Sequence, residues 1–257
     1  MAKRWALVLG ASSGFGEAAC RRFALAGWPI FGVHLDRRAG LKHVEDLIAH
    51  IEGTGVQAKF FNINAADAEK RDAALDEMRA AMGTGDDVGM LMHSLAFGTL
   101  RPYVGDDALT EAQMDMTLRV MAHSLVDWTQ ALVKRDMMGD NARIYAMTSS
   151  GSTRVIPSYG AVSAAKCALE SHIRQLAFEL APRGITANAI RAGVTDTPAL
   201  RKIPGNDRLL DAAVTRNPAG RLTTPEDVAG CMLALADPGT RWMRCARRWE
   251  PATTSAC

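Results

Sequence analysis

The 257-residue sequence contains no long apolar run and carries little net charge. No apolar stretch approaches the length of about 20 residues that a membrane-spanning helix needs, so we expect no membrane partner. The N-terminus M-A-K-R-W-A-L-V-L-G turns into glycines too soon for a secretory signal peptide. A net charge of +2 creates no strong field for nucleic acid or for a membrane surface, and we therefore expect neither as a partner.

The cysteines are few, odd in number and scattered. None of them has the spacing of a metal-binding motif, so we predict no metal site. This usage is typical of the reducing cytoplasm, where we expect the protein to act. The five positions are Cys20, Cys167, Cys231, Cys245 and Cys257.

A glycine-rich segment follows the first apolar segment. Residues 4–9 have the composition of a short buried strand, G-A-S-S-G-F-G occupies 10–16, and a helical pattern then continues to Gly27. Glycines let a backbone approach a pyrophosphate, and a helix N-terminus offers free N–H groups with a partial positive charge. A tight turn without a ligand is the alternative. We predict cofactor binding by Gly10, Ser12, Ser13, Phe15 and Gly16.

Asp36 stands twenty residues after Gly16, at the end of a second predicted strand over 29–35. A carboxylate in this place accepts hydrogen bonds from the ribose hydroxyls of a dinucleotide, which favours NADH. Arg37 and Arg38 follow at once, and either could instead meet the 2′-phosphate of NADPH. NADPH therefore remains an alternative cofactor. The two arginines could also be solvent-exposed residues at the start of a helix, without any contact to a cofactor.

Predicted strands and helices alternate through most of the chain. Such alternation indicates a parallel sheet covered on both faces, a single-domain α/β Rossmann fold that is doubly wound. Nothing resembling a linker, repeat or low-complexity stretch divides it, so we assign 1–240 to one domain and 241–257 to an atypical tail. The later predicted helices cover 41–52, 66–82, 110–138, a segment ending near 181, and one beginning at Pro225; the later strands cover 56–63, 87–92, 142–148 and 184–190.

Several polar or glycine-containing segments fall at the predicted carboxyl ends of strands. In an open parallel sheet, ligands bind beyond those ends. Any one of these segments could be an ordinary loop, but their convergence predicts a binding site. They are the glycine turn, Asp36, Asn62-Ile63, His93-Ser94-Leu95-Ala96, Ser149, and Ala192-Gly193-Val194 with Thr197.

A hydroxyl, a phenol and an ammonium group cluster between Ser149 and Lys166. Tyr159 and Lys166 are seven residues apart, about two helical turns, so they can share a helix face if the helix begins early. A lysine on that face could lower the pKa of the phenol and make it a usable acid. An amphipathic rim is the alternative for an isolated Tyr/Lys pair.

Together, G-A-S-S-G-F-G, the Tyr/Lys helix, I-T-A-N-A-I-R-A-G-V-T-D-T and the βα order resemble the short-chain dehydrogenase/reductase superfamily over about residues 4–237. The usual Tyr-x-x-x-Lys is absent, because its tyrosine slot holds Val162, and Tyr159 makes Tyr-x6-Lys instead. With H-S-L-A-F at 93–97, this spacing is similar to that of the bacterial enoyl-acyl-carrier-protein reductases. L-A-F-G-T-L-R-P and P-A-G-R resemble the branch nearest the ketoacyl reductases.

The resemblance implies catalytic roles for Tyr159, Lys166 and Ser149. It implies a cytoplasmic NAD(P)H-dependent reductase of trans-2-enoyl thioesters, carried on acyl carrier protein during fatty-acid elongation, and a homotetramer. We further expect backbone contacts of Ser94, Leu95 and Ala96 on the nicotinamide side, Asn62 and Ile63 beside the adenine, Thr197 on the carboxamide or pyrophosphate, and Lys166 on the nicotinamide ribose. His93 is expected to be structural, and a basic cluster at Arg201, Lys202 and Arg208 could form a lid or a carrier-protein dock.

Two departures keep other functions open. Many enoyl reductases have a second tyrosine ten residues before the catalytic one, where this chain has Ser149, and Met121 stands where most superfamily members have a helix asparagine. A serine at position 149 is typical of ketone reducers, so a carbonyl, hydroxysteroid or 3-ketoacyl oxidoreductase is the alternative function. A non-catalytic nucleotide-binding relative is the second alternative, because the tail is abnormal.

The tail departs from the resemblance after about Trp242-Met243. Superfamily members usually finish with a strand ending near Val-Asp-Gly-Gly, whereas this chain continues as Arg244-Cys245-Ala246-Arg247-Arg248-Trp249-Glu250. A frayed terminus and a basic, tryptophan-containing patch are two interpretations. A third is a shifted reading frame, since Arg-Arg-Trp-Glu can be encoded CGT-CGA-TGG-GAA and a one-base shift reads GTC-GAT-GGG, which is Val-Asp-Gly.

We therefore predict a single-base frameshift just after Met243 or Arg244. Sequencing the coding DNA checks this: adding or removing one base near those codons should restore a Val-Asp-Gly ending. If no single-base shift restores it, the hypothesis is wrong. A protein that truly carries the shifted tail would lose its last strand and leave an unpaired sheet edge, with a cost in stability or assembly.

Overall fold

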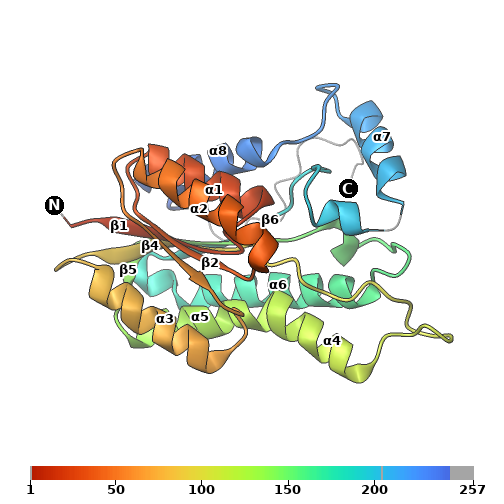
Figure 1. The fold of residues 1–257 in the computed structure, drawn as a ribbon, viewed down its shortest axis with the longest axis horizontal. Helices are drawn as coiled ribbons and strands as arrows, with labels where there is room; N and C mark the ends of the chain where they lie inside the picture. Colours follow the sequence, from red (N-terminus) through yellow and green to blue (C-terminus); the bar gives the residue numbers. More distant parts are fainter. Residues whose placement is uncertain (1, 204, 244–257) are drawn as a thin grey trace.

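The computed structural model describes residues 2–203 and 205–243. They form an α/β fold around one six-stranded sheet whose strands all run parallel, which confirms the predicted fold class (Figure 1). The predicted frameshifted segment lies outside the described residues. Within them, no helix is both long and apolar enough to cross a membrane.

The sheet has the spatial order β3-β2-β1-β4-β5-β6, so the chain starts in the middle and winds outwards in both directions. The crossover from β3 to β4 is the point where the winding reverses, and the carboxyl ends of β1 and β4 lie side by side there. The strands are β1 (Arg4–Leu9), β2 (Ile30–His34), β3 (Ala58–Asn62), β4 (Asp87–His93), β5 (Met138–Met147) and β6 (Thr186–Ile190).

Helices cover both faces of the sheet. In Figure 1, α1, α2 and α8 lie above it, and α3, α4, α5 and α6 lie below it, while α7 projects beyond the carboxyl ends of the strands. The helices are α1 (Gly14–Leu25), α2 (Arg38–Glu52), α3 (Ala68–Ala81), α4 (Glu111–Leu118), α5 (Ser124–Lys134), α6 (Gly160–Glu179), α7 (Asn206–Arg216) and α8 (Pro225–Ala236), with a π-helical turn η1 (Arg119–His123) joining α4 to α5.

Alternating residues of β1 supply the two halves of the core. Trp5, Leu7 and Leu9 pack with Trp128 of α5 and residues of α3 and α6, whereas Ala6 and Val8 pack on the other face with α1, α2 and α8. Successive side chains of a strand point to opposite faces, so a strand buried on both sides is apolar throughout. This double burial explains why R-W-A-L-V-L has no polar alternation.

The helix predicted over 110–138 is shorter than expected. It continues through η1 and α5 but stops at Lys134, and Met138 already belongs to β5. Asp136 has a φ of 49°, in the left-handed region, and the Met137 N–H donates to the Leu132 carbonyl at 2.9 Å. This is the geometry of a C-terminal cap that ends an α-helix. The sequence contains no glycine at this cap to indicate the stop. Met137 and Met138 are core residues in this turn and strand.

The first βα turn is packed too tightly for a side chain at Gly16, where an added Cβ would lie 1.9 Å from the Gly10 carbonyl oxygen. We predict that Gly16→Ala lowers the free energy of unfolding by about 1–3 kcal/mol, although alanine is the better helix former. Gly230→Ala is the matched control, because Gly230 is also helical and an added Cβ there meets nothing within 4 Å. Urea unfolding of both variants checks this, and equal stabilities would contradict the close contact.

Candidate active site

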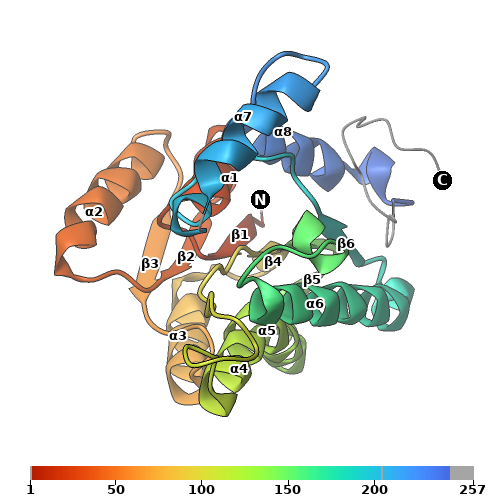
Figure 2. The same cartoon turned by 90° about the vertical axis from the view of Figure 1, so that its right-hand side faces the viewer.

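The predicted site residues lie at the carboxyl edge of the sheet, at or after the ends of all six strands and, for Tyr159 and Lys166, at the start and in the second turn of α6. Figure 2 looks onto this end of the molecule, with α7 drawn over α1 on one side of the sheet and α4 on the other side. The glycine turn follows β1, Asp36 follows β2, and Ser149 follows β5. A parallel sheet places these ends along one edge, so residues distant in sequence face a common space.

The glycine turn presents bare backbone to that space. Gly10 has a φ of 89°, and a Cβ there would meet the Ser94 carbonyl oxygen at 2.5 Å, so the turn lies directly against the end of β4. Ser13 caps α1 without a side-chain hydrogen bond, which leaves the first N–H groups of the helix available. The donor-rich helix end and the cradle that a Cβ would fill fit the pyrophosphate of a dinucleotide.

Asp36 is held through its backbone by Asn62. The Asp36 N–H donates to the Asn62 Oδ1 and the Asn62 Nδ2 donates to the Asp36 carbonyl, each at 3.0 Å. The Asp36 Oδ2 also lies 2.9 Å from the Nδ1 of buried His34. Arg37 and Arg38 are exposed at the start of α2. Asn62 thus holds the backbone that carries the Asp36 carboxylate. The adenine contact of Asn62 stays a prediction.

Tyr159 and Ser149 are brought together by the turn that precedes α6. The Tyr159 hydroxyl donates to the Ser149 Oγ at 3.3 Å, and the same oxygen accepts from the Gly151 N–H at 3.1 Å. Tyr159 is the N-cap residue of α6, and Ser158 before it has a φ of 59°, a conformation that costs a non-glycine residue about 1–2 kcal/mol. Backbone strain next to a reactive side chain is a feature of functional sites.

Lys166 lies two turns into α6 with its ammonium buried. Its Nζ donates to the Met147 carbonyl at 2.7 Å. Burial lowers the pKa of Lys166 to about 8, against the charge of Glu170, which raises it. The expectation that Lys166 lowers the pKa of Tyr159 is wrong in this structure: burial raises the phenol pKa, and the hydrogen bond with Ser149 opposes that rise. Tyr159 is therefore protonated at neutral pH and can donate a proton.

Glu170 holds the loop that carries Ser149, a role that was not predicted from the sequence. Its Oε1 accepts from the Thr148 hydroxyl at 2.6 Å and from the Ser152 hydroxyl at 2.8 Å. These bonds clamp the loop that carries Ser149 onto α6. The spacing of four residues from Lys166 places Glu170 on the same helix face, and that spacing could have indicated it.

The loop after β6 packs against the glycine turn. Thr197 is buried, accepts from the Leu200 N–H at 3.2 Å, and lies where a Cβ on Gly14 would touch it at 3.4 Å. Gly193 has no room for a side chain, because a Cβ would meet the Thr223 hydroxyl at 2.3 Å. In the predicted basic cluster, Arg201 is paired with Asp196, with Nε–Oδ1 at 2.8 Å, which offsets part of its charge.

Apolar side chains surround Tyr159. Leu95, Met121 and Val162 belong to its hydrophobic cluster. Met121 and Val162, which stand where most superfamily members have an asparagine and a tyrosine, thus both contribute apolar surface. Gly98 lies against them, since a Cβ there would meet the Met121 sulfur at 2.7 Å and the Val162 Cγ2 at 2.9 Å. The other members are Ala66, Leu100, Met116, Leu118, Val120, Ile156, Ala165 and Ile203.

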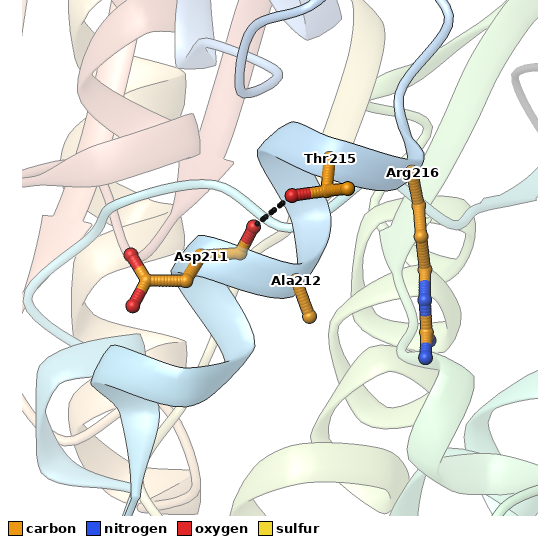
Figure 3. Close-up of a pocket in the computed structure, with 4 residues that line it drawn as sticks. All are labelled: Asp211, Ala212, Thr215 and Arg216. Carbon is orange, nitrogen blue, oxygen red and sulfur yellow. Dashed lines mark hydrogen bonds between the residues drawn. The ribbon is translucent and has the colours of Figure 1, made fainter.

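An open hollow of about 440 Å³ lies on α7, separate from the predicted site residues (Figure 3). Asp211, Ala212, Thr215 and Arg216 line it, and the Thr215 hydroxyl donates to the Asp211 carbonyl at 3.1 Å. All four residues belong to one helix, so the hollow is a surface feature of α7. The side-chain geometry around Tyr159 identifies the candidate site instead.

Residues 10–246 match the family model described as Enoyl-(Acyl carrier protein) reductase. The chain is 31% identical over 153 residues to the NADH enoyl-acyl-carrier-protein reductase of Aquifex aeolicus, covering 59% of this chain and 56% of that protein. It is 26% identical over 239 residues to the 1-cyclohexenylcarbonyl-CoA reductase of Streptomyces collinus, covering 92% of this chain and 81% of that protein.

Among solved structures, a short-chain dehydrogenase from Burkholderia cenocepacia in complex with NADP superposes with a TM-score of 0.80. It is 28% identical, and the match covers 94% of each chain. A family model matching most of the chain and a superposition over nearly its full length agree with the geometry at the sheet edge. The chain belongs to the short-chain dehydrogenase/reductase superfamily of oxidoreductases, close to the enoyl-acyl-carrier-protein reductases.

Proposed function

We propose that this protein reduces trans-2-enoyl thioesters with NAD(P)H, on acyl carrier protein and in fatty-acid elongation. The observation that carries the proposal is the position of Tyr159, at the N-cap of α6 and seven residues before Lys166, with Val162 filling the usual tyrosine slot. Relatives named as reductases of unsaturated acyl thioesters support it, among them the reductases of Aquifex aeolicus and Streptomyces collinus.

The position of the phenol agrees with the chemistry of an enoyl thioester. In a ketone, the oxygen to be protonated is bonded to the carbon that takes hydride. In an enoyl thioester, the β-carbon takes hydride and negative charge collects on the thioester oxygen, two carbons further along. A proton donor for that oxygen must stand further from the nicotinamide, and moving the phenol about one turn back along α6 does this.

A bound dinucleotide supplies the hydride. The glycine turn and the N-terminus of α1 would hold its pyrophosphate, Asp36 its adenosine ribose hydroxyls, and Lys166 its nicotinamide ribose. Ser94, Leu95 and Ala96 would contact the nicotinamide side, Thr197 would bond the carboxamide or the pyrophosphate, and Gly193 and Val194 would complete the cofactor site. Tyr159 would then stabilise or protonate the enolate oxygen. Because burial raises its pKa, the phenol keeps its proton until the substrate oxygen becomes basic.

The apolar cluster around Tyr159 would receive the acyl chain. Met121 and Val162 replace polar side chains at the two positions where ketone-reducing members have asparagine and tyrosine, which lowers the local polarity. An acyl chain gains from such burial about 0.8 kcal/mol per methylene. Carrier protein as the partner, a cytoplasmic site of action and a homotetramer are proposed from the family resemblance.

A carbonyl oxidoreductase is the second candidate function, favoured by the hydrogen bond between Tyr159 and Ser149 at 3.3 Å. Two hydroxyls converging on one point could bind a ketone oxygen. Loss of reduced-nicotinamide absorbance separates the functions: a crotonyl thioester should be reduced under the main proposal, and an acetoacetyl thioester under this one. Reduction of neither would indicate a nucleotide-binding protein without reductase activity.

We predict that Tyr159→Phe lowers the rate of crotonyl-thioester reduction by about 10²–10⁴-fold, because the acid is lost. Affinity for the dinucleotide, measured by fluorescence titration, should stay nearly unchanged, whereas Lys166→Ala should damage both. Tyr145→Phe is the matched control, since this buried hydroxyl donates to the Met232 carbonyl away from the site, and its rate should be preserved. A Tyr159→Phe enzyme that kept most of its rate would show that the acid is elsewhere.

We also predict that this enzyme prefers NADH and that Asp36→Ala shifts the preference toward NADPH. Removing the carboxylate removes repulsion of a 2′-phosphate and leaves Arg37 and Arg38 to bind it. The ratio of kcat/KM for the two dinucleotides measures the shift, and adding Arg38→Ala to the variant should reduce the gain. A wild-type enzyme that already binds NADPH more tightly would contradict the assignment.

A further inference from the structure

His93, the last residue of β4, is a fully buried histidine whose hydrogen bonds determine its tautomer. Its Nε2 lies 2.9 Å from the Ser124 Oγ, and the Ser124 hydroxyl donates to the Val120 carbonyl at 2.8 Å. The single hydroxyl proton is therefore already used, so Ser124 accepts and the histidine Nε2 donates. The Nδ1 is left as an acceptor carrying a lone pair.

That Nδ1 has no hydrogen-bond partner among the described residues, although it is buried. Leaving a buried acceptor unsatisfied is unfavourable, and buried waters commonly pair with such groups. The ring is a neutral acceptor at all working pH values, because burial and then the Lys166 charge lower the His93 pKa to about 3. The charge of His172 on α6 acts in the same direction.

From α6, the Lys166 side chain reaches the end of β5, the strand that pairs with β4 next to His93. His93 pairs in register with Ala146 of β5, and the next residue, Met147, accepts from the Lys166 Nζ at 2.7 Å. An ammonium has three N–H donors, and this bond uses one of them. The charge of Lys166 also acts on the His93 ring, so the two groups are near each other. Among the described residues, the buried His93 nitrogen lacks a donor, while the Lys166 ammonium carries three N–H donors and gives one of them to the Met147 carbonyl.

We propose that His93 is a positioning residue for Lys166: one buried water accepts a hydrogen bond from the Lys166 ammonium and donates one to the His93 Nδ1. With the Met147 carbonyl, this water would hold the ammonium from the sheet side and leave its third N–H for the dinucleotide ribose. The role of Lys166 toward the ribose rests on the proposed function, whereas the water bridge does not. His93 itself touches neither substrate nor cofactor.

A high-resolution crystal structure of the wild-type protein with its dinucleotide tests the bridge directly. The expected result is one ordered water within hydrogen-bond distance of both the His93 Nδ1 and the Lys166 Nζ. A direct contact between the two groups, a different donor on Nδ1, or a dry Nδ1 would overturn the proposal. This observation requires no turnover, so it stands apart from the identity of the thioester substrate.

Two substitutions of His93 distinguish a role in positioning Lys166 from a role in core packing alone. His93→Asn keeps an amide group near the Nδ1 position and loses the contact with Ser124, whereas His93→Gln keeps a donor near Nε2 and loses the Nδ1 acceptor. Since an acceptor stabilises the charged ammonium, the alkaline fall in dinucleotide affinity should move to lower pH in His93→Gln and return towards the wild-type position in His93→Asn.

The corresponding loss of kcat in His93→Gln should be about tenfold, with substantial recovery in His93→Asn. The affinity profile, measured by dinucleotide fluorescence without substrate, remains a readout if thioester reduction fails. Equal profiles in both variants would show that His93 serves packing alone. If neither variant folds, the wild-type crystal structure still decides whether the bridge exists.

Discussion

The bond between the buried Lys166 ammonium and the Met147 carbonyl joins the two elements on which the candidate site depends. It ties α6 to the end of β5, so the helix that presents Tyr159 has a defined position relative to the strand that leads to Ser149. Burying an ammonium is unfavourable, which is why the pKa of Lys166 falls to about 8. Each partner of that ammonium therefore matters both for its position and for its charge.

The loop between β5 and α6 follows from this attachment. Glu170, one turn beyond Lys166, accepts hydrogen bonds from Thr148 and Ser152, and Ser163 donates to the Gly151 carbonyl at 2.6 Å. The segment carrying Ser149 is thus bonded to α6 at several points. Such support allows the strained Ser158 to persist and directs the phenol towards Ser149.

A site of this construction combines polar chemistry with apolar surroundings. Tyr159 meets Ser149 on one side, while Met121 and Val162 belong to the hydrophobic cluster that encloses it. Burial raises the phenol pKa and so preserves its proton. Tyr159, seven residues before Lys166, and Ser149 are thus hydrogen-bonded to each other within one partly apolar site.

The sequence by itself determined the parallel α/β fold and the convergence of the glycine turn, Asp36, Ser149 and Thr197, because apolar strand segments and strand-end motifs are local patterns. The end of α5 at Lys134 required the structure, since its cap uses Asp136 in a left-handed conformation without glycine. The raised pKa of Tyr159, the pairing of Arg201 with Asp196, and the His93 nitrogen that has no partner among the described residues also required it. Burial sets the pKa of Tyr159 and the environment of His93, and burial arises from contacts between elements distant in sequence. The Arg201–Asp196 pair is local, but its geometry depends on the conformation of the loop after β6.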